Sequence, residues 1–176
     1  MKQAGLTEYN GVSKFLHWSM AILIFAEWCI GATLDYTEWS SLHFQIGTII
    51  LLLVVLRIVW KVITPQPAMD GSLTKLNQLA ASMGHGVLYL LMILVPALGL
   101  TLLYVKGSPV NLLGFDIPKL ISTPWTHDSR HLVKEIHSFF AVVLVSFAGL
   151  HGLIAIVHYI RHKTILQRML PKCMKK

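Results

Sequence analysis

The sequence predicts an all-α integral membrane protein folded as a four-helix bundle. Of its 176 residues, 55% are hydrophobic and only 13% are charged, and the mean hydropathy of +0.63 is too high for a soluble domain of this size. With little chain left outside the apolar segments, we expect a single domain over residues 1–176. Four segments each hold about 20 or more mostly apolar residues, enough to cross about 30 Å of hydrocarbon. They are about Lys14–Leu34, His43–Lys61, Leu76–Tyr104 and His131–Ile160.

Local signals support each span in turn. The first starts late, carries Glu27 and has no small-residue cleavage site, so we do not expect a cleaved signal peptide. Pro65 and Pro67 close the second span, and Pro96 interrupts the third, where we expect a kink. The long link 106–130 before the fourth span contains several glycines and prolines, which argue against a continuous helix.

Basic residues are placed asymmetrically, and this predicts the orientation of the bundle. Eleven of the fifteen Lys and Arg residues precede the first span, surround the link between the second and third spans, or follow the fourth span. The link between the first two spans holds Asp35 and Glu38 but no Lys or Arg. The positive-inside rule therefore predicts that both termini are cytoplasmic. The basic tail suits anionic lipid of the bilayer, and we expect no nucleic-acid partner.

Nine histidines occur, and several lie within or at the edges of the spans. A polar ring in a bilayer is costly without a partner, so these residues are candidates for function. His137 and His151 lie fourteen residues apart in one predicted helix. That spacing returns to within about 40° of the same face with a rise of roughly 21 Å. Counted by depth, His43 and His137 form an outer layer, and His17, His85 and His151 form an inner layer.

Two layers of histidines suit two haems held one above the other, each between two imidazoles. The inner layer has one histidine more than a pair, and the sequence leaves open whether His17 or His85 joins His151. No CxxCH motif occurs, so any haem would be bound non-covalently. Glycines near the histidines would let a flat macrocycle approach the backbone, although ordinary small-residue helix packing is the alternative. They are Gly31, Gly47, Gly84, Gly86, Gly149 and Gly152.

Four motifs in order along the chain resemble the four helices of a known family. They are Lys14-Phe-Leu-His17-Trp18; His43-Phe-Gln-Ile-Gly47 with Arg57 and Trp60; His85 with Leu88–Met92 and Pro96–Gly99; and His137, His151 and His158. The resemblance covers nearly the whole chain. It is to bacterial cytochrome b561, which is related to the membrane cytochrome b subunits of formate dehydrogenase and nickel-iron hydrogenase.

The resemblance implies a bundle in the bacterial inner membrane with two haem b groups and with ubiquinone as electron acceptor. The inner haem iron would take His17 and His151, and the outer haem iron His43 and His137. His85 would then lie beside a haem or in a pocket, with an inner haem on His85 and His151 as the alternative. Arg57 would pair with a haem propionate, or simply extend its charge to the membrane surface.

The bacterial branch of this family is also associated with oxidation of superoxide at the outer face, with the electron passing to quinone. Basic residues on the outer side would steer the superoxide anion, whereas the plain alternative is a solvated loop. They are Lys106, Arg130 and Lys134. Near the inner surface, His158 would donate a proton to quinone or bind it, with Trp18 and Arg161 at similar depth. Glu27, near mid-membrane, is expected to be protonated or hydrogen-bonded, with an undecided role.

Three functions therefore compete. The first is a superoxide:ubiquinone oxidoreductase, and the second is an electron-transfer subunit that docks on a periplasmic dehydrogenase as its redox partner. The third, from another class, is a haem-free proton or metal transporter. Sharp absorption bands of reduced b-type haem would exclude the third.

Overall fold

The computed structural model describes residues 2–3, 8–68, 74–106, 110–112, 114–117, 125–162 and 166–170. Within these residues the chain is dominated by long helices, with two pairs of very short strands. In chain order the elements are β1 (Lys2–Gln3), α1 (Gly11–Ala32), α2 (Ser40–Ile63), β2 (Gln66–Pro67), α3 (Lys75–Lys106), β3 (Val110–Leu112), β4 (Phe115–Ile117), α4 (His127–His162) and a 3-10 turn, η1 (Leu166–Arg168).

The predicted all-α membrane fold is confirmed. In the described part of the chain, α1 to α4 are all long and apolar enough to cross a membrane. Helix α1 begins three residues earlier than predicted because Asn10 caps it, its side-chain oxygen accepting a hydrogen bond from Ser13 N at 2.8 Å. The other three helices extend past the predicted apolar segments at both ends, since polar residues continue a helix once its apolar part is formed. Pro96 lies inside α3 without ending it.

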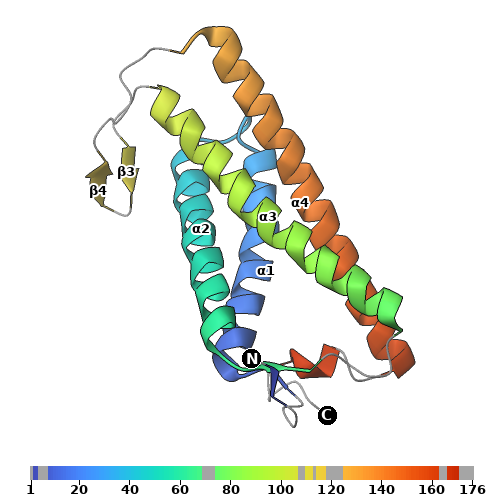
Figure 1. Cartoon of the computed structure of the whole chain (residues 1–176). Coiled ribbons are helices and arrows are strands. Elements are labelled where there is room, and N and C mark those ends of the chain that lie inside the picture. Colours follow the sequence, from blue (N-terminus) through green and yellow to red (C-terminus); the bar gives the residue numbers. More distant parts are fainter. Residues whose placement is uncertain are drawn as a thin grey trace.

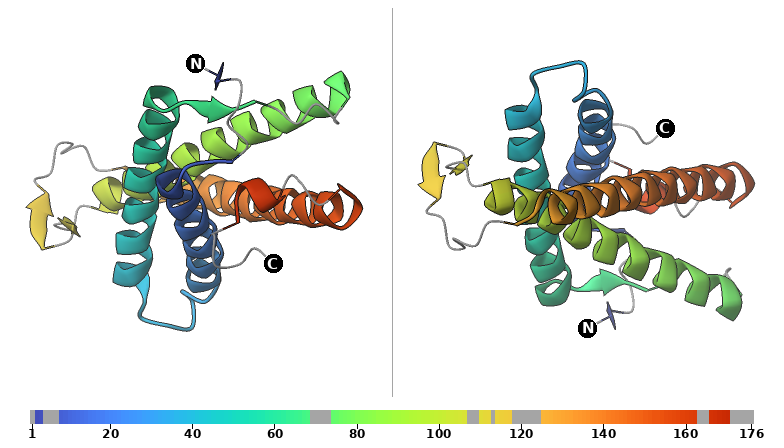
Figure 2. Two further views of the ribbon diagram at one scale, coloured as in Figure 1. Left: turned by 90° about the horizontal axis from the view of Figure 1, so that it is seen from below. Right: turned by 90° about the horizontal axis from the view of Figure 1, so that it is seen from above.

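The four helices run alternately up and down, so both termini lie at the same end of the bundle (Figure 1). We call this the inner end and the opposite end the outer end, following the orientation expected from charge. Helices α1 and α2 pack together, α3 packs on α2 and α4, and α4 also contacts α1. Towards the inner end, α3 and α4 swing away from α1 and α2 (Figure 2).

The buried core occupies the middle of the bundle. In each helix the core residues fall, in sequence, between an outer and an inner polar position; in α2, for example, they follow His43 and precede Arg57. Few side chains are buried, because each helix of a single four-helix bundle has one face that points outward. Large apolar residues such as Val62 (73% exposed) cover the outside, as expected for a lipid-facing surface. The core is Met20, Ile24, Ile50, Val54, Leu91, Met92, Val95 and Leu144.

Polar contacts tie the inner ends of the helices together. Trp60 Nε1 donates to Asn10 Oδ1 at 3.2 Å and so links α2 to the cap of α1. Trp18 Nε1 donates to Met169 O at 2.9 Å, which fixes the segment after α4 beneath α1. Strands β1 and β2 pair in parallel near the same end.

The long outer link contains an element that the sequence did not predict. Strands β3 and β4 form an antiparallel hairpin with Gly114 at its turn, where φ of +90° favours glycine. The hairpin projects beside the bundle (Figure 1), and Phe115, the first residue of β4, is 77% exposed. The prediction that this link is not a continuous helix is confirmed for its described residues.

Candidate functional site

The two outer histidines come from diagonally placed helices and face each other. His43 lies in the first turn of α2 and His137 in the outer third of α4. Their ring centroids are 6.0 Å apart with an angle of 81° between the ring planes. Two imidazoles that bind one iron from opposite sides have centroids about 6 Å apart, given a metal–nitrogen bond of about 2 Å and about 1.1 Å from nitrogen to ring centre. The outer pair therefore fits a single iron between its rings.

Glycines make room for both outer rings. A Cβ built on Gly31 would lie 3.0 Å from Cε1 of His43, and one built on Gly99 would lie 3.2 Å from Cε1 of His137. Any larger residue would displace the imidazoles, because both distances are tighter than ordinary van der Waals contact. The packing thus fixes where the two rings stand.

The nitrogen of each outer ring that points away from the pair also has a neighbour. His137 Nδ1 lies 2.9 Å from Val95 O, and as the donor it leaves Nε2 unprotonated for a metal. His43 Nδ1 lies 2.8 Å from Glu27 Oε1, a close approach that does not have hydrogen-bond geometry. A histidine that ligates a metal commonly has a carbonyl or carboxylate beside its second nitrogen.

The inner layer brings three histidines together. His17 and His151 have ring centroids 6.2 Å apart at 85° between planes, whereas His85 and His151 are 5.1 Å apart at 73°. Only the first separation matches the value of about 6 Å expected for a shared iron. His85 Nδ1 lies 2.7 Å from Ala81 O on its own helix. His85 therefore lies beside the pair that His17 and His151 form.

Positive charge surrounds the inner layer. Arg57 on α2 acts electrostatically on all three inner histidines. Its Nε donates to the Tyr89 hydroxyl at 3.1 Å, and Lys61 Nζ lies 4.8 Å from the centre of the Tyr89 ring. Arg57 is thus held among polar partners near the histidines, where a haem propionate would find a counter-ion.

A groove of about 390 Å³ opens between the inner ends of α3 and α4. Its lining combines apolar and polar side chains, as a ligand with a hydrocarbon tail and an oxygen-bearing head requires. The lining residues are Asn77, Leu153, Ile154, Val157, His158 and Arg161.

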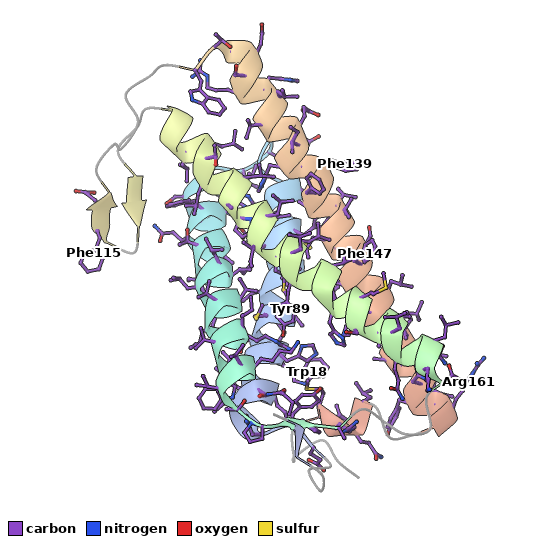
Figure 3. The ribbon with its side chains drawn as sticks, viewed as in Figure 1. Trp18, Tyr89, Phe115, Phe139, Phe147 and Arg161 are labelled. Carbon is purple, nitrogen blue, oxygen red and sulfur yellow. The ribbon has the colours of Figure 1, made fainter. Side chains whose placement is uncertain are left out.

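The structure brings together two of the three residues expected to bind quinone. His158 and Arg161 both line the groove. Trp18 does not line it; its ring packs 5.6 Å from the ring of His17 and its Nε1 is bound to Met169 O. Figure 3 shows Trp18 and Arg161 at separate places of the inner end. Depth alone had grouped them, but the swing of α3 and α4 separates them laterally.

The outer basic residues are only partly described. Arg130 and Lys134 lie exposed near the start of α4, whereas the side chain of Lys106 falls outside the described residues. Acidic groups share this surface: Glu135 lies 3.8 Å from His131, and Asp128 lies 3.7 Å from His127. The outer surface of α4 is therefore a mixed rather than a purely basic patch.

Sequence reasoning missed several contacts. It placed Glu27 at mid-membrane without a partner, and it did not assign the Val95 carbonyl a role. Of the six glycines noted beside histidines, only Gly31 supports a ring directly, and Gly47 instead lies against Glu27. A Cβ on any of the other four would meet no described atom within 4 Å, so the alternative of close helix packing does not apply to those four. Such pairings depend on helix rotation, which spacing does not fix.

A membrane bundle with paired histidines at two depths has the architecture of a membrane cytochrome b. Residues 8–172 match the family model of prokaryotic cytochrome b561. The chain belongs to this family, whose members are haem b proteins of electron transfer in bacterial membranes.

Curated relatives agree with this assignment over nearly their whole length. Cytochrome b561 homolog 2 of Escherichia coli (strain K12) is 30% identical over 174 residues, covering 93% of this chain and 92% of the relative. A probable superoxide oxidase of Yersinia pestis is 29% identical over 172 residues, covering 94% and 97%. Cytochrome b561 homolog 1 of Escherichia coli (strain K12) is 24% identical over 176 residues, covering 95% and 99%.

Proposed function

We propose that this cytochrome binds two haem b groups and passes electrons from superoxide at its outer face to ubiquinone at its inner face. The carrying observation is the pair of facing imidazoles at each of two depths, with ring separations of 6.0 Å and 6.2 Å. The proposed iron ligands are His43 and His137 for the outer haem, and His17 and His151 for the inner haem. His85 stands beside the inner pair.

Haem b held between two histidines supplies reversible one-electron redox chemistry without an open coordination position. The protein's own residues fix its place and surroundings. His137 Nδ1 is held by Val95 O, which would orient that ring, and the Glu27 carboxyl lies 2.8 Å from His43 Nδ1. At the inner layer, Arg57 provides a counter-charge for a propionate.

The outer face meets the anionic substrate. Arg130 and Lys134 are exposed there, and their charges would raise the local concentration of superoxide. Two superoxide anions give up one electron each and leave as dioxygen. Together those two electrons and two protons convert one ubiquinone into ubiquinol.

The inner groove meets the quinone. Among the residues that line it, Leu153, Ile154 and Val157 would contact the isoprenoid tail, and His158 and Arg161 would contact the head. His158 would donate a proton to a quinone oxygen, and Arg161 would hold that oxygen by hydrogen bonding. Both protons would be drawn from the cytoplasm, given that the termini are cytoplasmic and the membrane is the bacterial inner membrane. The excess of Lys and Arg around the inner links and tail supports this orientation.

The test uses purified protein in detergent or nanodiscs. Pyridine haemochrome analysis should give two haems per chain. An enzymatic superoxide source should reduce these haems, and added short-chain ubiquinone should reoxidise them and appear as ubiquinol, while added superoxide dismutase should abolish the reduction. Haems that stay oxidised in the superoxide flux, together with a dehydrogenase that co-purifies and reduces them, would instead establish the docking-subunit function.

A further inference from the structure

Glu27 is the one buried carboxyl group among the described residues, and its place is unusual. It lies on α1 five residues before that helix ends, at the depth of the outer histidines rather than at mid-membrane, with 9% of its surface exposed. Its Oε1 is 2.8 Å from His43 Nδ1, and its Oε2 is buried without a hydrogen-bond partner in the described part of the chain. The other described carboxylates are all exposed. Burying a carboxyl group in apolar surroundings costs free energy, so its burial beside a histidine indicates that Glu27 has a function.

The contact is built into the packing of α1 against α2. A Cβ on Gly47 would lie 3.2 Å from Glu27 Oε1, so the absence of a side chain there gives the carboxyl group its space. Gly31, four residues after Glu27 on α1, lies against the Cε1 and Nδ1 atoms of the His43 ring. A glycine and a carboxyl group of α1 therefore both contact the Nδ1 side of this imidazole.

The two proposed haem sites differ in charge as a result. The outer site has a carboxyl group against one ring and a neutral carbonyl, Val95 O, against the other. On the inner half of α2, in contrast, two basic side chains gather around Tyr89: Arg57 Nε donates to its hydroxyl at 3.1 Å, and Lys61 Nζ lies 4.8 Å from the centre of its ring. An anion stabilises the ferric form of a haem, which carries one more positive charge, and a cation stabilises the ferrous form.

We infer that Glu27 is a positioning residue that acts through His43 to hold the reduction potential of the outer haem below that of the inner haem. Electrons then pass downhill from the outer face to the inner face. The inference rests on the proposed function, because it takes His43 as a haem ligand. This role of Glu27 is distinct from relaying protons and from packing α1 against α2.

The experiment is a redox titration of the purified holoprotein, followed by optical and electron paramagnetic resonance spectra. The Glu27→Gln substitution keeps the size of the side chain and removes its capacity for negative charge. We expect a tenfold shift of the one-electron equilibrium of the outer haem towards the reduced form, which is about 59 mV upward. The inner haem should keep its potential, and the low-spin signal of the outer haem should move. The His43→Ala variant, which loses the outer haem, identifies which signal belongs to it.

Two variants serve as controls. Glu38→Gln removes the same charge from the exposed outer link and should move neither potential. Glu27→Asp keeps the charge and should return the outer potential towards that of the unmodified protein. If Glu27→Gln loses the outer haem, the Asp variant decides: a near-normal outer potential supports the inference and an altered one with the haem retained overturns it.

Unchanged potentials in Glu27→Gln with both haems bound overturn the inference, and so does an equal shift of both haems. Failure of the proposed function looks different. In that case His43→Ala retains two haems, or superoxide fails to reduce the haems of the unmodified protein. Neither of those results depends on the state of Glu27.

Discussion

The outer and inner histidine layers solve the same structural problem with different degrees of constraint. Each outer ring touches a glycine on a neighbouring helix, and each has a second-nitrogen neighbour from another helix. The inner layer holds three histidines, and the backbone carbonyl that His85 contacts, Ala81 O, belongs to its own helix. Interhelical packing thus defines the outer pair. At the inner layer, it is chiefly the ring separation that distinguishes the pair His17 and His151 from the alternative pair His85 and His151.

Histidines of the two layers therefore have different surroundings, although each layer pairs histidines that lie at the same depth. The outer end is compact, whereas at the inner end α3 and α4 swing away from α1 and α2 (Figure 2). The groove at His158 and Arg161 lies at this inner end, between α3 and α4. A rigid end suits fixed cofactor geometry, and an open end suits a substrate that must enter and leave.

The largest expected effect is the loss of a haem on removal of its ligand. His43→Ala should lower the haem content from two to one per chain, and His17→Ala should do the same at the inner layer. His85→Ala should keep two haems, because its ring stands 5.1 Å from His151, too close for a shared iron. Pyridine haemochrome analysis of the three variants measures this directly. If His85→Ala loses a haem and His17→Ala does not, the inner pair is His85 and His151.

The next prediction compares the rate of quinone reduction at the inner end with the rate of haem reduction at the outer end. His158→Phe should slow ubiquinone reduction by roughly a hundredfold, as expected for loss of a general acid. Reduction of the haems by superoxide should remain unchanged, since the groove lies at the opposite end from the outer histidines. Stopped-flow spectra with and without quinone resolve the two steps. Trp18→Phe is the matched comparison, because Trp18 does not line the groove; an equal loss in both variants would argue against this location of the quinone.

A smaller effect is expected at the outer face. The double variant Arg130→Gln with Lys134→Gln should reduce the rate of haem reduction by superoxide about three- to tenfold at low salt, and the difference should shrink as salt is raised. Quinol oxidation from the inner side should be unaffected. Rates measured across a salt series test this. A rate that keeps its original value at low salt would show that these two residues do not steer the anion.

The smallest expected effect concerns the glycines. Gly31→Ala should destabilise the protein by about 1–3 kcal/mol, because its Cβ would lie 3.0 Å from the His43 ring. Gly149→Ala should be neutral or stabilise α4 by about 0.5–1 kcal/mol, since a Cβ there meets no described atom within 4 Å. Thermal unfolding of both holoproteins in the same detergent compares them. Equal destabilisation would mean that the two ends are packed alike.

Much of this arrangement follows from the sequence. The four spans were predicted to within four residues at each described end, because apolarity and a rise of about 1.5 Å per residue are local properties. The same counting placed His43 with His137 and grouped the three inner histidines. It failed for Trp18, which shares a depth with His158 but lies elsewhere around the bundle.

The sequence by itself therefore determined the fold class, the two layers of histidines and the alternation of the helices. Only the tertiary structure decided which ring faces which, that Glu27 meets His43, that Gly31 and Gly99 make room for the outer imidazoles, and that His158 and Arg161 share a groove. The physical reason is that depth follows from counting residues along one helix. Facing relations depend on the rotation and tilt of each helix against its neighbours, and those are set by packing of the whole bundle.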